Sequence, residues 1–219
     1  MPHQFRTLMA FLLLSACAPY AKGPVFTQEN AEKTFQPFIE FMDIKPGMAV
    51  ADVGAGSGAL TVIMATQLDN CAVYIQDIDH QVLEQENVNK MIAYYSGQLG
   101  YELGQRNQFH LVYGTTTQSN LPDGSIDVIY SNATMHVFDA PDAMLQDLRK
   151  KLKPTGKIFI RDSFRGDHGE GEFCSSSKCA RRLLSIEEFL AMMDKNGYRL
   201  IKQSPDMDGY SLFGFELGD

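Results

Sequence analysis

One acidic residue and a group of glycines give this sequence its clearest chemical signature. A short apolar run, 48–53, carries Asp52 and is followed by an apolar segment from Leu60 to Leu68 that predicts a helix. Between the two lie Gly54, Gly56 and Gly58. Glycine lets the backbone turn tightly, adopt positive φ and approach a ligand more closely than a Cβ would permit. Free N–H groups at the start of the following helix would then be donors for a polar group. The pattern predicts a strand, a ligand-binding turn and a helix.

A second acidic residue extends this signature. The apolar run Ala72 to Gln76 ends in Asp77, 19 residues after Gly58. A carboxylate at a strand end can accept hydrogen bonds from both hydroxyls of a ribose, so the two features together predict a nucleoside cofactor. Gly54-x-Gly56-x-x-Ala59 also satisfies the relaxed dinucleotide pattern, which keeps a nicotinamide cofactor as an alternative. Asp52 opposes it, because dinucleotide-binding strands usually carry an apolar residue there.

Four segments resemble one family in the correct order. Val50–Gly58 resembles the first motif of class I S-adenosylmethionine-dependent methyltransferases, and Tyr74–Asp79 resembles their second strand. Leu121–Asp127 resembles the family's "LP-D-x-S-F-D" segment, and Leu152–Lys157 resembles the turn before its fifth strand. The resemblance runs from about Phe35 to Arg161.

The resemblance implies a fold, a cofactor and a set of contacts. The fold is α/β: a doubly wound, mostly parallel, seven-stranded Rossmann-like sheet with an antiparallel last strand. The cofactor is S-adenosyl-L-methionine. Its expected binding residues are Asp52, Gly54, Gly56, Gly58, Asp77, Thr115 and Asn132. Thr115 stands where many members have an acidic residue that holds the adenine amino group, and a hydroxyl would accept that hydrogen bond more weakly.

His136 is the candidate catalytic residue. The segment from Ser131 to His136 follows the fourth expected strand, where open parallel sheets place ligands. A histidine there could accept a proton during methyl transfer. The alternative is a histidine that lines the pocket or caps the next helix. Asn132 is not followed by Pro-Pro-aromatic, the amide-methylating signature of DNA and some protein methyltransferases. The acceptor is expected to be a small molecule.

The expected elements follow from periodicity, capping residues and turn signals. Helices are predicted from Thr27 to about Met42, with Pro37 kinking or dividing it, from Asp79 to about Leu99, from Ala140 to Leu152, and from Ser185 to about Lys195. Beyond the two strands above, strands are predicted at 109–113, 126–130, 157–161, 198–203 and 210–216. The final pair favours a methyltransferase sheet over a dinucleotide fold.

Composition narrows the partners. The 219 residues suit one α/β domain, and the net charge of −8 disfavours nucleic acid, whose phosphates require a basic face. Cys174 and Cys179 would form a disulfide in an oxidising compartment, whereas free thiols, or zinc bound with His168, are alternatives. No metal is predicted, Cys71 is expected to be an unpaired packing residue, and the sequence does not indicate an oligomeric state.

The amino terminus resembles an export signal. The apolar run Leu8–Leu14 is followed by Leu14-Ser-Ala-Cys17, which resembles the lipobox of bacterial lipoproteins. Residues 1–17 would then be a signal, 18–26 a tether, and 27–219 the folded domain, anchored through a lipid on Cys17 and facing the periplasm. The alternative is an apolar terminal helix in a cytoplasmic protein.

The sequence thus predicts methyl transfer from S-adenosylmethionine to a small molecule. Two alternatives stay open. One is an exported protein that binds a nucleoside or S-adenosyl ligand without chemistry. The other is a nicotinamide-dependent oxidoreductase, which Asp52 and the last two strands oppose.

Overall fold

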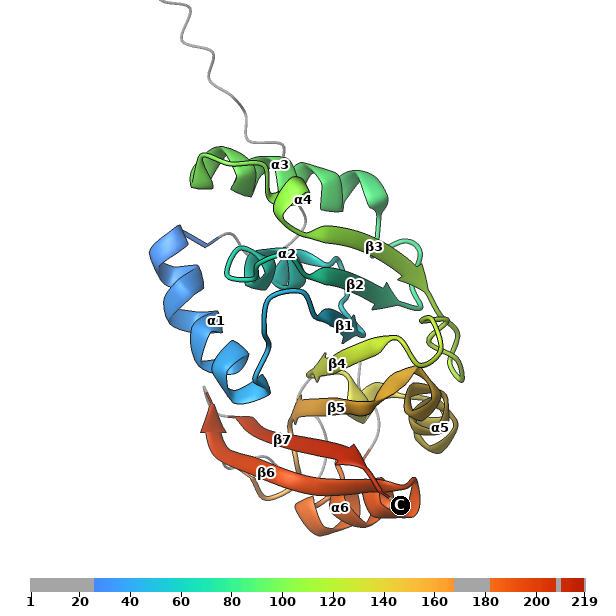
Figure 1. Cartoon of the computed structure of the whole chain (residues 1–219). Coiled ribbons are helices and arrows are strands. Elements are labelled where there is room, and N and C mark those ends of the chain that lie inside the picture. Colours follow the sequence, from blue (N-terminus) through green and yellow to red (C-terminus); the bar gives the residue numbers. More distant parts are fainter. Residues whose placement is uncertain (1–25, 168–181, 208–209, 219) are drawn as a thin grey trace, which may run out of the picture.

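The computed structural model describes residues 26–167, 182–207 and 210–218. Its centre is a seven-stranded sheet with the order β3-β2-β1-β4-β5-β7-β6 (Figure 1). The strands are β1 (Ala49–Val53), β2 (Ala72–Asp77), β3 (Gln108–Tyr113), β4 (Ile126–Asn132), β5 (Leu152–Asp162), β6 (Tyr198–Met207) and β7 (Tyr210–Leu217). Only β7 runs antiparallel to its neighbours, β5 and β6. The predicted fold class is confirmed.

The chain order places a crevice at the middle of the sheet. From β1 the chain proceeds outward through β2 to β3, and it then returns to the other side of β1 with β4 and β5. All of these neighbouring pairs are parallel. In such sheets the loops after the two central strands diverge, which leaves a crevice at their carboxyl ends. The predicted ligand residues Gly54 and Asn132 follow or end those strands.

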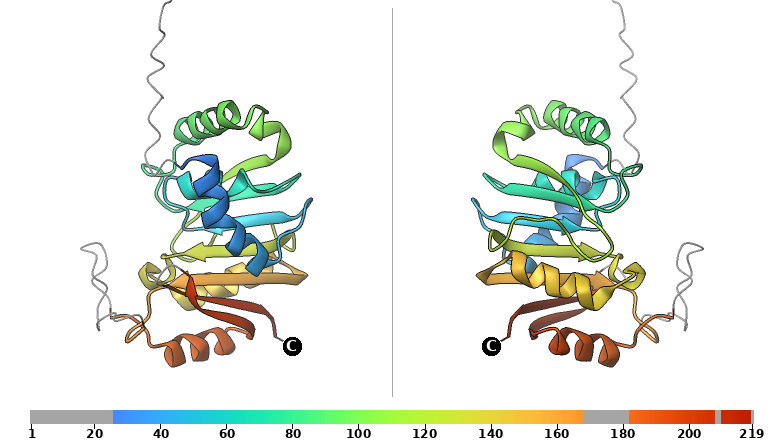
Figure 2. Two further views of the ribbon diagram at one scale, coloured as in Figure 1. Left: turned by 90° about the vertical axis from the view of Figure 1, so that its left-hand side faces the viewer. Right: turned by 90° about the vertical axis from the view of Figure 1, so that its right-hand side faces the viewer.

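Helices cover both faces of the sheet (Figure 2). One core contains side chains of α1 (Gln28–Met42), α2 (Ala59–Ala65), α3 (Gln85–Leu99) and α4 (Leu103–Arg106). The other contains side chains of α5 (Pro141–Lys151) and α6 (Ile186–Lys195), and the short 3-10 helix η1 (Met135–Val137) contributes Met135 to it. The crevice therefore has α1 to α4 on one side of the sheet and α5, α6 and η1 on the other.

Two helix predictions need correction. Pro37 does not divide α1, which continues from Gln28 to Met42, because its apolar face is buried against the core on both sides of the proline. The helix expected from Asp79 begins only at Gln85. There the carboxylates of Asp77 and Asp79 accept hydrogen bonds from backbone N–H groups two residues further on, which stabilises a turn instead of a helix.

Several smaller features agree with or extend the predictions. The capping box at Ser185 is present, with reciprocal hydrogen bonds between Ser185 and Glu188. Cys71 is buried and is a free cysteine, as expected. The sequence patterns did not predict α4, and β5 begins earlier than expected, at Leu152. Cys17, His168, Cys174 and Cys179 lie outside the described residues, so their predicted roles stay predictions.

Candidate functional site

The glycine turn after β1 is locked to the loop after β4. Gly54 has φ +79°, and a Cβ there would overlap the Thr134 methyl group. The Thr134 hydroxyl donates to the carbonyls of Gly54 (3.1 Å) and Asn132 (2.9 Å). Gly54 is therefore required both for its backbone conformation and for this close approach. Sequence reasoning missed Thr134, since an isolated threonine carries no pattern.

Two cavities flank this contact, and both are lined by Gly54 and Thr134. The α5-side cavity, of about 250 Å³, is lined by Gly54, Gln76, Asp77, Ile78, Thr115, Thr116, Thr134, Val137, Phe138, Asp139 and Met144. The α1-side cavity, of about 240 Å³, is lined by Phe35, Asp52, Gly54, Ala55, Gly56, Leu60, Thr61, Met64, Tyr130, Asn132, Ala133 and Thr134. Together they form a crevice over the carboxyl ends of the central strands, where doubly wound sheets bind ligands.

Asp77 closes the turn and faces the α5-side cavity. One carboxylate oxygen accepts the Gly56 N–H at 2.7 Å, and the other accepts the Asp79 N–H at 2.9 Å. A carboxylate oxygen has more than one acceptor position, so both oxygens retain capacity for hydroxyl groups of a ligand. The predicted strand-end carboxylate is thus present, held in place by the glycine turn itself.

Asp52 supplies a buried carboxylate to the α1-side cavity. It is 5% exposed and accepts a hydrogen bond of 2.6 Å from the Thr61 hydroxyl. Burial raises the pKa of Asp52 to about 6, although the Thr61 hydrogen bond opposes that rise. Burial, and then the neighbouring Asp52 carboxylate, raise the pKa of Tyr130. This cavity therefore holds a carboxylic acid whose pKa, about 6, lies well above its usual value.

Asn132 and Ala133, at the end of β4, also line the α1-side cavity. The Asn132 side-chain oxygen accepts a hydrogen bond of 2.8 Å from Arg161. Ala133 has φ +51°, a conformation that costs energy for a residue with a Cβ, and its N–H donates to the Arg161 carbonyl. The strained residue lies directly at the cavity, where such strain commonly has a functional role.

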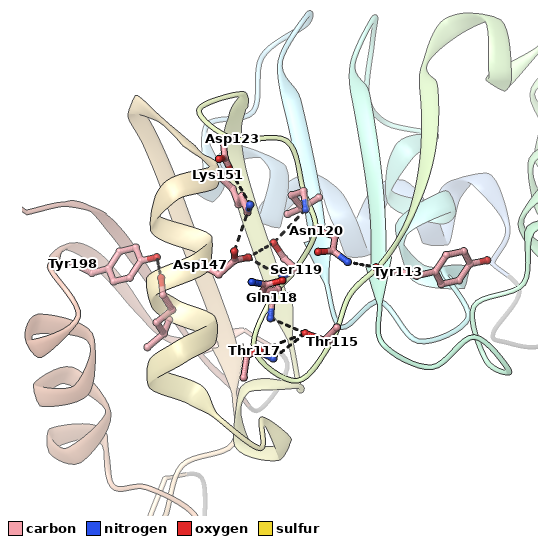
Figure 3. A network of polar contacts seen from close by, with 12 residues as sticks. Tyr113, Thr115, Thr117, Gln118, Ser119, Asn120, Asp123, Asp147, Lys151 and Tyr198 are labelled. Carbon is pink, nitrogen blue, oxygen red and sulfur yellow. Dashed lines mark hydrogen bonds and ion pairs between the residues drawn. The ribbon is translucent and has the colours of Figure 1, made fainter.

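Thr115 lies on a braced loop at the α5-side cavity (Figure 3). Its hydroxyl oxygen accepts the N–H groups of Thr117 (3.3 Å) and Gln118 (3.1 Å). These two bonds occupy the acceptor positions of the hydroxyl, which disfavours the predicted acceptance from an adenine amino group, and the Thr117 hydroxyl lies 3.5 Å away as a further partner.

The loop is fixed to α5 by a buried carboxylate. One Asp147 oxygen accepts both the N–H (2.7 Å) and the hydroxyl (2.6 Å) of Ser119, and Lys151 lies 3.4 Å from the other oxygen (Figure 3). Lys151 also pairs with Asp123 further along the loop. The β3–β4 connection is thus held at two points, which fixes the position of Thr115.

His136 lies beside the crevice, in η1. Its Nδ1 is 2.5 Å from an Asp162 oxygen, and its backbone N–H donates to the other oxygen at 3.0 Å. Both side chains are largely buried and line a separate small cavity of about 20 Å³ with Phe164 and Phe189. His136 is not among the residues that line the two larger cavities. Its catalytic role stays a prediction, and sequence reasoning missed its partner Asp162.

Within residues 26–167, 182–207 and 210–218, no group of three or more histidine, cysteine or acidic side chains could hold a metal ion. In the same ranges, no helix is both long and apolar enough to cross a membrane.

Comparison with known proteins defines the family. Residues 51–160 match the model described as a methyltransferase domain, half of the chain. This chain belongs to that family. A wheat (Triticum aestivum) phosphoethanolamine N-methyltransferase is 29% identical over 185 residues, which cover 84% of this chain. The same match covers 31% of the wheat protein, so this methyltransferase-family chain spans about a third of its relative's length.

Solved structures agree on the fold. A "SAM dependent methyltransferase" from Aquifex aeolicus superposes with a TM-score of 0.61 at 21% identity, covering 87% of this chain and 97% of that one. A Burkholderia thailandensis 1,6-didemethyltoxoflavin-N1-methyltransferase, solved with bound 1,6-didemethyltoxoflavin and S-adenosylhomocysteine, superposes with a TM-score of 0.59 at 17% identity, covering 88% of this chain and 79% of that one. At these identities the likeness concerns the fold alone.

Proposed function

We propose that this protein transfers a methyl group from S-adenosyl-L-methionine to a small-molecule acceptor. The observation that carries the proposal is the crevice around Gly54, in which a strand-end carboxylate, Asp77, faces one cavity and a buried carboxylate, Asp52, faces the other. Family membership supports it, as does the bound S-adenosylhomocysteine named for the Burkholderia structure. When bound, S-adenosylmethionine supplies an electrophilic methyl group on a sulfonium.

The residues of the crevice fit this cofactor. Asp77 has acceptor capacity for the ribose hydroxyls, and the apolar walls of the α5-side cavity, Ile78, Val137 and Phe138, suit a planar base. Asp52 in the α1-side cavity complements the cationic amine of the methionine portion. Gly54 and Thr134 line both cavities, so a ligand that extends from one cavity to the other would contact this pair.

Binding of the cofactor is tested by isothermal titration of the full chain with S-adenosylmethionine, S-adenosylhomocysteine and NAD. We expect micromolar affinity for the first two ligands and much weaker binding of NAD. Asp77→Ala removes charged hydrogen bonds and is expected to weaken S-adenosylhomocysteine about 10- to 100-fold. Asp79→Ala, two residues along the same turn, is the matched control and retains most of the affinity. Preference for NAD, or equal loss in both variants, would contradict the proposal.

The acceptor is proposed to be a small molecule with a nucleophilic nitrogen or similar atom. Support comes from relatives, namely the phosphoethanolamine N-methyltransferases of plants and an arsenite methyltransferase of Aquipseudomonas alcaligenes. Transfer of tritium from methyl-labelled S-adenosylmethionine to phosphoethanolamine, arsenite and a panel of amines tests this directly. Tight cofactor binding without transfer to any of them would favour the non-catalytic binding protein instead.

We also propose that His136 accepts a proton from the acceptor. The short contact between its Nδ1 and the Asp162 carboxylate favours a proton on Nδ1, which leaves Nε2 as the basic atom. Asp162 is then a positioning residue. We expect His136→Gln to lower kcat about 100-fold with unchanged cofactor affinity, and Asp162→Asn to lower kcat and shift its pH profile. Unchanged kcat in His136→Gln would reject the role.

Export is a separate proposal that rests on the amino-terminal residues alone. The apolar run Leu8–Leu14 and the sequence ending at Cys17 support processing as a lipoprotein that faces the periplasm. Expression in a Gram-negative host with labelled palmitate is expected to label the membrane-bound protein, and Cys17→Ser to abolish the label. An unlabelled protein in the cytosol that retains Met1 would contradict export.

A further inference from the structure

Gln76 is a polar side chain in the floor of the α5-side cavity. It lies next to the carboxyl end of β2, is 1% exposed, and lines the cavity together with Asp77 and Thr115. Sequence reasoning treated it as the end of an apolar run. A buried amide has two donors and an acceptor that must find partners, so its contacts need a complete account.

The orientation of the amide follows from the glycine turn. The side-chain oxygen of Gln76 accepts the Gly54 N–H at 3.3 Å, and its backbone carbonyl accepts the N–H groups of Gly54 and Ala55, both at 2.9 Å. Because Gly54 N–H can only donate, the oxygen faces the turn and the nitrogen faces the opposite way. Nε2 has no hydrogen-bond partner among the residues that the structure describes.

Gly114 makes room for this nitrogen. A Cβ at residue 114 would overlap Gln76 Nε2 and would lie 2.7 Å from the Gln118 carbonyl oxygen. The φ angle of Gly114 is outside the left-handed region, so the absence of a side chain provides space and not conformational freedom. The braced loop between β3 and β4 therefore leaves a buried, unpaired donor on Gln76, a residue that lines the same cavity as Asp77.

We propose that Gln76 is a specificity-determining residue whose Nε2 donates a hydrogen bond to an unprotonated ring nitrogen of the purine. The inference rests on the proposed binding of an S-adenosyl ligand. A purine presents such nitrogens at the edge of its rings, in the ring plane. The apolar side chains of Ile78, Val137 and Phe138, which line the cavity, would pack against the faces of the rings. The bound ligand thus satisfies a donor that the protein leaves unpaired, which makes the bond selective.

A thermodynamic cycle that combines a change in the Gln76 side chain with a change of one ligand atom tests this contact. S-Adenosylhomocysteine and its 1-deaza, 3-deaza and 7-deaza analogues are titrated into the full-length protein and into Gln76→Met. We expect one deaza analogue to bind the unmodified protein about five- to tenfold more weakly than S-adenosylhomocysteine. The affinity of Gln76→Met for S-adenosylhomocysteine should be lower by a similar factor. Its affinity for that analogue should be no lower than its affinity for S-adenosylhomocysteine.

Controls separate this contact from a general loss of structure. Gln108→Met, at an exposed position of β3, is expected to behave like the unmodified protein with every ligand. Gly114→Ala crowds the Gln118 carbonyl as well as the Gln76 amide, so it is the control for a general disturbance of the loop and should weaken all of the ligands together. Thermal melting verifies that each variant is folded.

The outcomes are distinct. If the unmodified protein binds S-adenosylhomocysteine but the effects of Gln76→Met and of every deaza substitution are independent, Nε2 donates elsewhere, for example to water, and only the role of Gln76 is rejected. If the unmodified protein binds no S-adenosyl ligand, the proposed function is rejected and the role of Gln76 with it.

Discussion

The two cavities share Gly54 and Thr134 but are built by different means. One wall of the α5-side cavity, at Thr115 and Thr116, belongs to a loop whose polar groups are held in a network, with Asp147 as its buried anchor. The α1-side cavity is formed on helices and strand ends and contains a buried acid, Asp52, which accepts a hydrogen bond from the Thr61 hydroxyl. The α5-side cavity is lined by two carboxylates, Asp77 and Asp139, whereas the α1-side cavity is lined by one, which is buried. The proposed ligand would place its nucleoside in the first cavity and its charged amine beside Asp52 in the second.

The largest effect is expected at the residue that both cavities share. Gly54→Ala places a Cβ against Thr134 in a left-handed conformation, and it should lower the free energy of unfolding by about 3 kcal/mol or more. S-Adenosylhomocysteine binding should be lost at the same time. Gly56→Ala is the control, because its Cβ meets nothing within 4 Å despite φ +56°, and about 1 kcal/mol is expected. Urea denaturation and titration calorimetry measure both, and equal effects would contradict the steric argument.

Ionisation of Asp52, in the α1-side cavity, should make the free energy of unfolding depend on pH. Its pKa is raised from 3.8 to about 6 in the folded protein, so its contribution to stability is fully present below about pH 3.8 and is lost as pH rises through about 6. That difference corresponds to about 3 kcal/mol. The stability of the unmodified protein relative to Asp52→Asn should fall by about this amount between pH 4 and pH 7.

Ligand binding should show the opposite trend at the same residue. Ionised Asp52 attracts the ligand amine, so the affinity of the unmodified protein for S-adenosylhomocysteine should increase as the pH rises through about 6. In Asp52→Asn this increase should be absent. Urea denaturation and calorimetry at several pH values provide the measurements, with the exposed Asp194→Asn as control. A pH-independent difference between the unmodified protein and Asp52→Asn would refute the assignment.

The anchor of the α5-side loop should contribute next. Asp147→Ala leaves the buried N–H and hydroxyl of Ser119 unpaired, and about 2 kcal/mol of stability should be lost. Affinity for S-adenosylhomocysteine should fall, while the pH dependence that Asp52 causes should persist. Asp123→Ala removes an exposed partner of the same Lys151 and should cost less than about 1 kcal/mol. If Asp123→Ala has the larger effect, the loop is held by its surface ion pair.

The smallest effect is expected at Thr115. Thr115→Val removes the hydroxyl that accepts the N–H groups of Thr117 and Gln118. The binding free energy of the nucleoside should fall by about 1 kcal/mol, which is roughly a fivefold loss of affinity. Thr116→Val, at the neighbouring exposed position of the same cavity, is the control. Competition titrations with S-adenosylhomocysteine and adenosine should show the same loss for both ligands, because the contact concerns the base side. Loss for S-adenosylhomocysteine alone would contradict this.

Local patterns determined most of the fold. The glycines near Asp52, the apolar runs ending at Asp77 and Tyr130, and the capping box at Ser185 depend on neighbouring residues, and each lies where it was expected. Where the chain departed from prediction, a nonlocal or competing contact decided the outcome. Core packing carried α1 through Pro37, and side-chain hydrogen bonds from Asp77 and Asp79 delayed the start of α3.

The sequence by itself determined the strand and helix positions and the residue types at the crevice, because these follow from short-range periodicity and spacing, and its motifs carried the family resemblance that implied the sheet. Only the tertiary structure decided which groups meet there. It paired His136 with Asp162, 26 residues away, set Thr134 against Gly54 and braced the Thr115 loop through Asp147. It also left the Gln76 amide nitrogen without a partner among the described residues. These contacts join distant segments through the packing of the sheet, so no local pattern in the sequence encodes them.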